Sequence, residues 1–350
     1  MKIIAWPAFK TKYKNPYNWL LYTHISQNEI EVREFSFKAI LQEKYDIFHF
    51  HWPVETIVRH PNLLIAWTRA RLMLVLIDWV RYKGTRIIWT VHDQKPHLLL
   101  HSKLAQWFES EFLKRVDGYI NLCEYSQVLT YQSFPILQDC ANTIIPHGHY
   151  REVYPNQISK TEAREKLDIP ENTHVLMFLG YIDYYKNIPK LIQTFKDLNL
   201  ENWMLVIAGK PEVSELAQEI IKLANSNPRI KLKLEFIPDE QIQTYLKAAD
   251  FVILPFQEIL NSGSAILALS FDCPILVPHQ GALSELQAQV GTDWVKLYEG
   301  TLTTGILREA LNWAVETGRL PKAPLEALDW SKLSQQTLNF YKEVITHSSG

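Results

Sequence analysis

Phe178-Leu-Gly-Tyr-Ile-Asp-Tyr-Tyr-Lys-Asn187 is the stretch that decides the fold of this chain of 350 residues. An apolar strand runs into a tight polar turn that opens a helix, and Asn261-Ser-Gly-Ser-Ala-Ile-Leu-Ala-Leu-Ser270 is a second turn of this kind. A helix N-terminus carries unpaired N–H groups and the positive end of the dipole. Two such termini at one cleft, with Lys186 as a mobile cation, therefore predict a site for a diphosphate.

Short β-branched and aromatic runs alternate with helical patterns along the whole chain. In the first half the expected strands are residues 2–5, 32–35, 47–50, 86–91, 118–122 and 143–145, with helices notably at 63–81 and 104–116. A helix at 160–167 opens a second series, with strands at 175–179, 204–208, 230–234, 251–254 and 275–277, and helices at 188–198, 213–224, 239–247 and 263–271. Such alternation indicates βαβ units and parallel sheets.

Two alternating series predict an α/β chain with two Rossmann-like domains that face a central cleft, where ligands bind at the carboxyl ends of the strands. We expect an N-terminal domain over residues 1–150 and a C-terminal domain over residues 151–329. Residues 330–350 contain an amphipathic segment and are expected to form a closing helix. The length also agrees with two cores rather than one.

The composition is that of a globular protein, with 47% hydrophobic and 21% charged residues. The net charge of −2 gives no general reason to expect a nucleic acid as partner. The charge is uneven, because residues 1–150 carry 17 Lys and Arg against 13 Asp and Glu, a net of +4, which leaves −6 for the rest. This asymmetry fits an N-terminal half that touches an anionic membrane or lipid phosphate, and chance variation explains it equally well.

Three features bear on localisation. The three cysteines show no CxxC spacing and are expected to be reduced thiols. Residues 1–7 are too short for a signal peptide and are expected to form a strand. The most apolar run, residues 63–80, contains two arginines and an aspartate, which disfavours a transmembrane span. The sequence predicts a cytoplasmic protein, whose apolar run is a helix packed on a sheet or, alternatively, touches the inner face of the membrane.

Polar side chains follow two strands of the N-terminal half. One strand ends in His49, His51 and Trp52, and strand alternation places the two histidines on one face. A metal pair is one interpretation, but no Cys, Asp or Glu recurs at ligand spacing, which favours hydrogen-bonded histidines in the core or the cleft. His92 and Asp93 follow the next strand, where the imidazole could orient a hydroxyl and the carboxylate could act as a base. The alternative for Asp93 is a cap of the following turn.

Glycines mark two further strand ends. Gly148 stands beside His147, which predicts close backbone approach to a ligand, with an ordinary interdomain turn as the alternative. Gly209 ends a strand of the C-terminal half, where a base or ribose could approach. Lys210 beside it is either a ligand or a solvated side chain. No single motif indicates a binding site. The shared position of these residues at strand ends does.

Nine short stretches occur in a fixed order along the chain: Phe48-His-Phe-His-Trp-Pro53, Trp89-Thr-Val-His92, Pro146-His-Gly148, Phe178-Leu-Gly180, Tyr185-Lys-Asn187, Ala208-Gly-Lys-Pro211, Pro238-Asp-Glu240, Ala248-Ala-Asp250 and Ser262-Gly-Ser-Ala265. In this order they resemble the motifs of GT-B glycosyltransferases, most closely the group-1/family-4 type and its relatives in bacterial polysaccharide and glycolipid assembly. The resemblance covers nearly the whole chain. It is specific for the fold and the reaction class, and it does not fix the substrates.

The resemblance implies an N-terminal domain for the acceptor and a C-terminal domain for a UDP- or GDP-linked sugar donor. It also implies that His92 contacts the transferred sugar and that Lys186 neutralises the donor diphosphate. The expected donor-binding residues are Gly180, Lys186, Gly209, Lys210, Glu258, Ser262, Gly263 and Ser264. The expected acceptor-side residues are His51, Trp52, His147 and Gly148.

Two departures from the family pattern concern the donor. The arginine that usually precedes the lysine is missing, because Tyr181 and Asp183 occupy the candidate positions. The usual pair of glutamates spaced by eight residues is broken, since Glu258 stands near the first position and the second falls at or beside Leu267. Either the donor is held differently in this chain or it is bound weakly.

A third departure lies after the first strand, where the family often has a glycine-rich loop. Residues 7–17 contain Lys10, Lys12 and Lys14 instead. These lysines could meet a pyrophosphate-linked acceptor, or they could form a solvated run.

We therefore expect a metal-independent glycosyltransferase that moves a sugar from a nucleotide diphosphate to a hydroxyl of a glycan or lipid-linked glycan, in exopolysaccharide or cell-surface glycan synthesis. Lys186 and the Ser-Gly-Ser helix start would meet the leaving-group charge, with no cofactor besides the nucleotide-sugar. Asp93 is the base if the reaction inverts configuration, and His92 supports the departing sugar if it retains configuration. The alternatives are a sugar-nucleotide epimerase of the same architecture and a catalytically retired binding or scaffold subunit.

Overall fold

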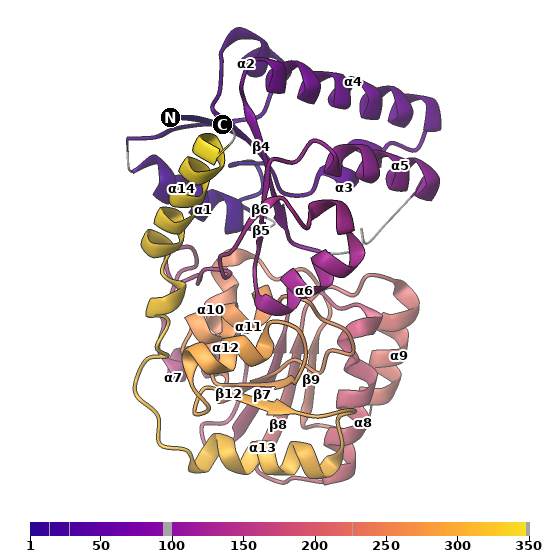
Figure 1. Ribbon diagram of the computed structural model, residues 1–350. Coiled ribbons are helices and arrows are strands. Elements are labelled where there is room, and N and C mark those ends of the chain that lie inside the picture. Colours follow the sequence, from indigo (N-terminus) through magenta and orange to yellow (C-terminus); the bar gives the residue numbers. More distant parts are fainter. Residues whose placement is uncertain (14, 28, 94–99, 226, 348–350) are drawn as a thin grey trace. The chain divides into compact units, whose positions relative to one another are not determined.

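The structure, a computed structural model, describes residues 1–13, 15–27, 29–93, 100–225 and 227–347. Its contacts divide the chain into two compact units, Met1–Gly148 with Leu328–Gly350, and His149–Ala327. Each unit is built on one six-stranded parallel sheet with helices packed around it (Figure 1). The chain thus has the α/β architecture with two Rossmann-like units that the sequence predicts.

The sheet of the first unit has the strand order β2-β1-β3-β4-β5-β6. Its strands are β1 (Lys2–Trp6), β2 (Glu31–Glu34), β3 (Ile47–Phe50), β4 (Arg86–Val91), β5 (Gly118–Asn121) and β6 (Ala141–Ile144). Its helices are α1 (Tyr17–Ser26), α2 (Phe37–Gln42), α3 (Pro53–Val58), α4 (Leu63–Tyr82), α5 (Ser102–Leu113), α6 (Glu124–Ser133), the short η1 (Pro135–Leu137) and α14 (Trp330–His347). The chain order reverses between β1 and β3, the kind of position at which ligands bind open parallel sheets.

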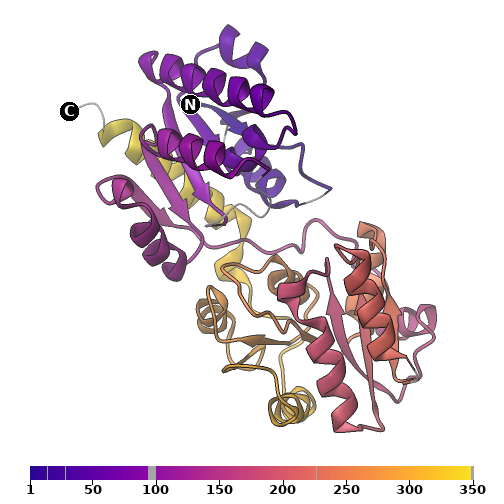
Figure 2. The same ribbon diagram turned by 90° about the vertical axis from the view of Figure 1, so that its right-hand side faces the viewer.

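The two-residue period of β3 divides its side chains between the two faces of this sheet. Phe48 and Phe50 join the hydrophobic core that α4 and α5 cover. His49 points to the other face, where Tyr341 of α14 lies 2.6 Å from its Nδ1. Figure 2 shows α14, in yellow, on the opposite side of the sheet from the purple helices. A strand whose residues are all buried therefore carries an aromatic face and a histidine face.

Helix α4 is the long helix packed on a sheet that the sequence predicts. The side chain of Asn62 caps it by accepting hydrogen bonds from the N–H groups of Leu64 and Ile65. Its buried residues recur every three or four positions, as in Ala66, Ala70 and Met73, so one face packs on the core and the other is exposed. Among the described residues, no helix has both the length and the apolar character needed to cross a membrane.

The sheet of the second unit has the strand order β12-β11-β10-β7-β8-β9. Its strands are β7 (His174–Leu179), β8 (Trp203–Ala208), β9 (Ile230–Lys233), β10 (Phe251–Ile253), β11 (Ile275–Pro278) and β12 (Val295–Tyr298). Its helices are α7 (Lys160–Lys166), η2 (Tyr184–Lys186), α8 (Ile188–Leu198), α9 (Ser214–Ala224), α10 (Asp239–Ala248), α11 (Gly263–Ser270), α12 (Leu283–Val290), α13 (Thr304–Glu316) and η3 (Glu326–Leu328). The order reverses between β7 and β10, which places the ends of β7 and β10 at the switch point.

The elements expected from the sequence differ from those of the structure mainly in their end residues. The structure also contains elements that were not expected. Most expected strands are present within one or two residues, and Ser159 caps α7 through a capping box with Glu162. The elements that were not named from the sequence include α1, α2, α3, α6, α12, α13 and β12. Helix α1 is hard to detect because Asn18 and Tyr22 are buried on it, so its inward face is not a clean apolar stripe.

Candidate functional site

Two glycines stand at the carboxyl ends of the neighbouring strands β7 and β8. Gly180 and Gly209 have φ angles of 145° and 150°, a conformation that L side chains rarely adopt. A Cβ placed on Gly209 would lie 1.8 Å from the carbonyl oxygen of Gly180. The loops after these strands are thus in backbone contact, and residue 209 has to be glycine for them to pass.

Lys186 and Ser264 converge on Gly180 from two different elements. A Cβ placed on Gly180 would lie 3.6 Å from Lys186 Nζ, at the end of η2, and 3.3 Å from Ser264 Oγ, in the first turn of α11. The structure therefore brings together three of the residues that the sequence predicts for donor binding. The left-handed conformation of Asn187, with φ of 56°, redirects the chain from η2 into α8.

Burial controls the charge of Lys186. The side chain is buried, and this burial lowers its pKa to about 8. Its Nζ lies 5.2 Å from the ring centroid of Phe256, a distance at which the ring face attracts a cation. Among the described residues no hydrogen bond or ion pair engages this ammonium group. A cation held in this way is available to a phosphate.

The start of α11 is the second part of this site. Ser262 is buried and caps the helix by accepting a hydrogen bond from Ala265 N–H at 3.1 Å. The hydroxyl of Tyr150 lies 3.1 Å from the position that a Cβ on Gly263 would take, so glycine keeps this turn open. Tyr150 was not predicted as a site residue. The N–H groups and positive dipole end of α11 suit an anion beside Lys186.

Three positions that were predicted or considered for donor binding lie outside the group formed by Gly180, Lys186 and Ser264. Lys210 is exposed, and its contribution is the carbonyl that accepts a hydrogen bond from Ile182 N–H at 2.9 Å. Glu258 is exposed in the loop before α11. Tyr181, which stands where the family arginine was expected, is 51% exposed. The role of each of these residues in donor binding remains a prediction.

In the first unit the predicted histidines meet at the carboxyl ends of β3 and β4. His51 Nδ1 lies 2.9 Å from His92 Nε2, and the indole ring of Trp52 stacks on His92 with centroids 4.2 Å apart. Tyr17 of α1 meets the edge of His92 at 4.9 Å. The hydrogen bond to His51 and the ring contacts with Trp52 and Tyr17 thus hold the imidazole of His92.

These histidines are neutral. Burial lowers the pKa of His92 to about 3, although the charge of Asp93 opposes this shift, and burial lowers the pKa of His51 well below the usual value. Burial also lowers the pKa of His49 to about 3. A histidine with such a pKa is a poor general base near neutral pH, because its imidazole binds a proton too weakly. His92 can still orient a hydroxyl or donate a hydrogen bond.

Asp93 lines a cavity of about 40 Å³, together with His51, Trp52, Pro53, Val54, Glu55, Trp89 and Glu109. The space admits a few waters or the edge of a sugar ring. Burial raises the pKa of Glu109, which reaches the cavity from α5. Sequence reasoning did not identify Glu55 or Glu109, because neither follows a strand.

His147 and Gly148 pack against aromatic rings. His147 donates a hydrogen bond from Nδ1 to the carbonyl of Gly148 at 2.8 Å, and its ring lies 4.8 Å from that of Tyr17. A Cβ on Gly148 would lie 2.4 Å from the indole of Trp330, in the first turn of α14. Packing against Trp330 is therefore enough to account for glycine at this position. The sequence prediction attributed this glycine to ligand approach.

Within the ranges that the structure describes, no group of three His, Cys, Asp or Glu side chains could hold a metal ion. His49 and His51, which the sequence analysis considered as a metal pair, are instead hydrogen bonded to tyrosine hydroxyls and to neighbouring side chains.

Comparisons with known proteins show what this chain is similar to. Residues 159–286, which contain Gly180, Lys186 and Ser264, match the model of the family described as "Glycosyl transferases group 1". The GDP-mannose:glycolipid 4-beta-D-mannosyltransferase of Xanthomonas campestris pv. campestris is 26% identical over 331 residues, which cover 95% of this chain and 89% of the relative.

Solved structures share the fold. Sucrose-phosphate synthase from Thermosynechococcus elongatus matches with a TM-score of 0.70 and 15% identity, over 99% of this chain and all of that one. The Anabaena protein HepE, solved in complex with UDP and glucose, matches with a TM-score of 0.62 and 15% identity, over 100% of this chain and 99% of that one. With the two-unit parallel architecture, these matches identify the chain as a glycosyltransferase with the GT-B fold, whose residues 159–286 are similar to the group-1 family.

Proposed function

We propose that this chain transfers a hexose from a GDP- or UDP-linked donor to a hydroxyl of a glycolipid or lipid-linked glycan, as a step in the synthesis of a cell-surface or exported polysaccharide. The observation that carries the proposal is the convergence of Lys186 Nζ and Ser264 Oγ on the backbone of Gly180. The relative from Xanthomonas uses GDP-mannose and a glycolipid according to its name, and HepE was solved with UDP. Both support a nucleotide-sugar donor, and the first supports a lipid-borne acceptor.

The donor diphosphate is proposed to lie between Lys186 and the start of α11. The leaving nucleotide carries the negative charge that develops as the sugar departs, and a buried ammonium beside a helix N-terminus stabilises this charge. Ser262, Gly263 and Ser264 would give their N–H groups or hydroxyls to the phosphates. The proposal includes no metal and no cofactor besides the nucleotide-sugar, since these groups supply the required positive charge.

Asp93 is the proposed general base, and His92 the proposed contact of the transferred sugar. Asp93 and Trp52 line the same cavity, in which a carboxylate can accept a hydroxyl proton beside an aromatic surface. The low pKa of His92 supports the division of roles, because a neutral imidazole orients oxygen atoms and leaves proton abstraction to the carboxylate. With an enzymic base the reaction inverts the configuration of the donor.

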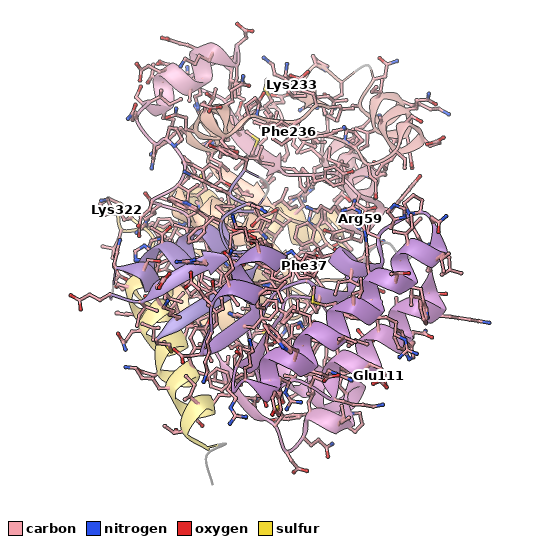
Figure 3. The ribbon with its side chains drawn as sticks, turned by 90° about the horizontal axis from the view of Figure 1, so that it is seen from above. Phe37, Arg59, Glu111, Lys233, Phe236 and Lys322 are labelled. Carbon is pink, nitrogen blue, oxygen red and sulfur yellow. The ribbon has the colours of Figure 1, made fainter. Side chains whose placement is uncertain are left out.

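A contact with the membrane surface is also proposed, mainly through α4. Its outer face exposes Leu64, Trp67 and Val75 together with Arg71, whose guanidinium lies 5.1 Å from the rings of Trp67 and Trp107. Figure 3 views this side of the first unit and labels Phe37 of α2, which is 55% exposed. Apolar side chains among arginines fit a bilayer with anionic head groups. The enzyme would then act as a peripheral protein at the inner face of the membrane.

One lysine of the lysine-rich loop after β1 has an aromatic partner within the chain. Lys12 Nζ lies 4.0 Å from the ring centroid of Trp19, so this cation already has an aromatic partner. Lys10 is exposed, and Lys14 lies outside the described residues.

The function is tested by incubating the chain with GDP-mannose or UDP-glucose and with dodecyl β-D-glucoside, a sugar on an alkyl chain. The expected result is release of GDP or UDP that depends on the acceptor, with a mass increase of one hexose in the glucoside. Proton NMR of the product then shows whether the configuration is inverted. Conversion of the donor without an acceptor would instead indicate an epimerase or a hydrolase and contradict the proposal.

A further inference from the structure

The carboxylate of Glu34, at the end of β2, is bound by three consecutive N–H groups of the loop after β1. Its Oε2 atom accepts hydrogen bonds from the N–H groups of Ala8 at 3.1 Å, Phe9 at 2.8 Å and Lys10 at 3.1 Å. Ala5 of β1 pairs in parallel with Glu34, so the carboxylate leaves the sheet beside the start of this loop. The side chain of Glu34 is half-buried there.

Convergent N–H groups of this kind form an anion-binding site. Successive backbone N–H groups that point to one place bind the phosphates of nucleotides in P-loops. A carboxylate is also an oxyanion and receives the same charge-assisted hydrogen bonds. In dinucleotide-binding Rossmann domains an acidic residue further along the chain contacts the ribose of the nucleotide. The acid at the end of β2 in this chain, Glu34, instead meets the loop of its own unit.

The loop after β1 is connected to the histidines at the carboxyl ends of β3 and β4. The carbonyl of Trp6, directly before the loop, accepts a hydrogen bond from His51 N–H at 3.2 Å. The carbonyl of Pro7 accepts a hydrogen bond from Nδ2 of the buried Asn18 of α1 at 2.8 Å. Asn18 follows Tyr17, whose ring lies 6.0 Å from that of His51. The path of this loop therefore affects the surroundings of His51.

We propose that the N–H groups of residues 8–10 form an oxyanion site whose ligand is the carboxylate of Glu34, and that Glu34 is thereby a positioning residue of the acceptor side. The proposal rests on the proposed function in one respect, namely that the first unit binds the acceptor. With the carboxylate in place, the loop has its conformation before a substrate arrives, so acceptor binding includes no cost for ordering it. Without the carboxylate, three N–H groups lose a charged acceptor.

The same assignment accounts for the residue types in this loop. A bulky phosphate requires close approach to the backbone, which favours glycine. A carboxylate at the end of a flexible side chain reaches the N–H groups without this requirement, so residues 8–10 can be Ala, Phe and Lys. A side chain of the protein thus replaces the ligand, and the loop does not need to be glycine-rich.

The site is tested by removing its ligand and supplying another. Glu34→Ala loses two carbons and the charge, and acetate is the probe because it restores both. The full chain is labelled with ¹⁵N-phenylalanine, and the amide signal of Phe9 is assigned by its loss in Phe9→Leu. This signal should shift in Glu34→Ala. Sodium acetate should return it toward its position in the unaltered chain, whereas sodium chloride at the same ionic strength should not.

A second variant and a matched control complete this test. Glu34→Gln keeps an oxygen acceptor without the charge, so it should give a smaller shift, and it keeps the test open if Glu34→Ala fails to fold. Glu31→Ala is the control, because Glu31 lies on the same strand and its carboxylate pairs with the side chains of Lys2 and Arg33. It should leave the Phe9 signal unchanged. An unmoved Phe9 signal in both Glu34 variants, or a signal in Glu34→Ala that acetate does not return, overturns the oxyanion site.

Kinetics separate positioning from a purely structural role. In Glu34→Ala the KM for dodecyl β-D-glucoside should rise at least about fivefold while the KM for the donor is unchanged, because the loop then has to be ordered when the acceptor binds. Acetate should lower this KM again, and a general loss of stability would not respond in this way. An unchanged KM for the glucoside in both Glu34 variants would overturn the positioning role.

The two possible failures are distinguishable. The response of Phe9 to acetate needs no substrate, so it decides the oxyanion site whether or not the chain transfers a hexose. Absence of transfer by the unaltered chain would contradict the proposed function alone.

Discussion

The carbonyl oxygen of Gly180 occupies the place that a side chain on residue 209 would need. The β7 and β8 backbones continue to pair beyond this contact, since Gly180 N–H donates to Ala208 O at 3.0 Å and Ile182 N–H donates to Lys210 O at 2.9 Å. The two loops are therefore one hydrogen-bonded unit, and their path determines where Lys186 reaches Gly180. A change at residue 209 should act on donor binding through this path.

Gly209→Ala should lower the affinity for GDP or UDP by at least about tenfold, because the new methyl group meets a backbone oxygen at 1.8 Å and the φ of 150° is strained for alanine. Isothermal titration calorimetry with the nucleotide measures this effect. The matched control is Gly318→Ala, whose Cβ would have no neighbour within 4 Å. Equal affinities in the two variants would mean that the loops do not form the donor site.

Lys186→Met should stabilise the chain without ligand and weaken donor binding. The folded protein holds the ammonium group at a pKa of about 8 instead of 10.5, so removing it relieves a penalty of roughly 3 kcal/mol at neutral pH for burying the charge. The lost contact to phosphate should cost at least about tenfold in affinity. Thermal unfolding and titration with GDP or UDP measure both effects. Lys190→Met, an exposed lysine of α8, is the control that should change neither.

The same lysine should make nucleotide affinity depend on pH. Below pH 8 the free chain carries the charged ammonium, and above pH 8 it must take up a proton to bind the diphosphate, so affinity should fall as pH rises through this value. The stability of the chain without ligand changes in the opposite direction. The folded state loses the proton first, and therefore the penalty of the buried charge disappears between about pH 8 and 10.5. A pH-independent affinity from pH 7 to 10 would contradict this role of Lys186.

Asp93→Asn should abolish transfer and leave nucleotide binding nearly unchanged, because an amide cannot accept the hydroxyl proton. The measurement is acceptor-dependent nucleotide release, with calorimetry on the same samples. Glu109→Gln is the informative comparison, since Glu109 lines the same cavity and has a pKa raised by burial. Full activity in Asp93→Asn with loss in Glu109→Gln would assign the base to Glu109.

The strand-end residues show how far the sequence could predict this site. Gly180, Lys186 and Ser264 were predicted together because each follows a recognisable strand or opens a helix, and the topology of a parallel sheet brings such positions to one edge. His51 and His92 were predicted for the same reason. Local pattern and topology were sufficient for these residues.

The residues that were missed depend on tertiary packing that no local pattern encodes. Tyr341 contacts His49 across 292 residues of sequence, and on α14 it looks like an ordinary core residue. Gly148 was predicted to approach a ligand, but its packing against the ring of Trp330, which a Cβ would meet at 2.4 Å, was not predicted. The pairs Tyr341–His49 and Trp330–Gly148 form because α14 packs on the first sheet, and no local sequence pattern predicts that packing.

The membrane surface gives the last prediction. Leu64 and Val75 are 72% and 64% exposed on the outer face of α4, near Arg69 and Arg71. We expect the chain to sediment with vesicles of phosphatidylglycerol at low salt, and less with phosphatidylcholine. Each arginine near an anionic surface contributes on the order of 1 kcal/mol, and salt screens this contribution.

Two sets of substitutions locate the contact. Leu64→Ser with Val75→Ser should weaken binding at every salt concentration, since apolar burial is not screened, whereas Arg69→Gln with Arg71→Gln should weaken it mainly at low salt. Replacing Lys10 and Lys12 by Ser should have the smaller effect, because Lys12 already packs on Trp19. If the lysine variant loses binding and both α4 variants keep it, the loop after β1 is the membrane contact. If the unaltered chain does not bind the anionic vesicles even at low salt, the acceptor has to reach the enzyme away from the bilayer surface.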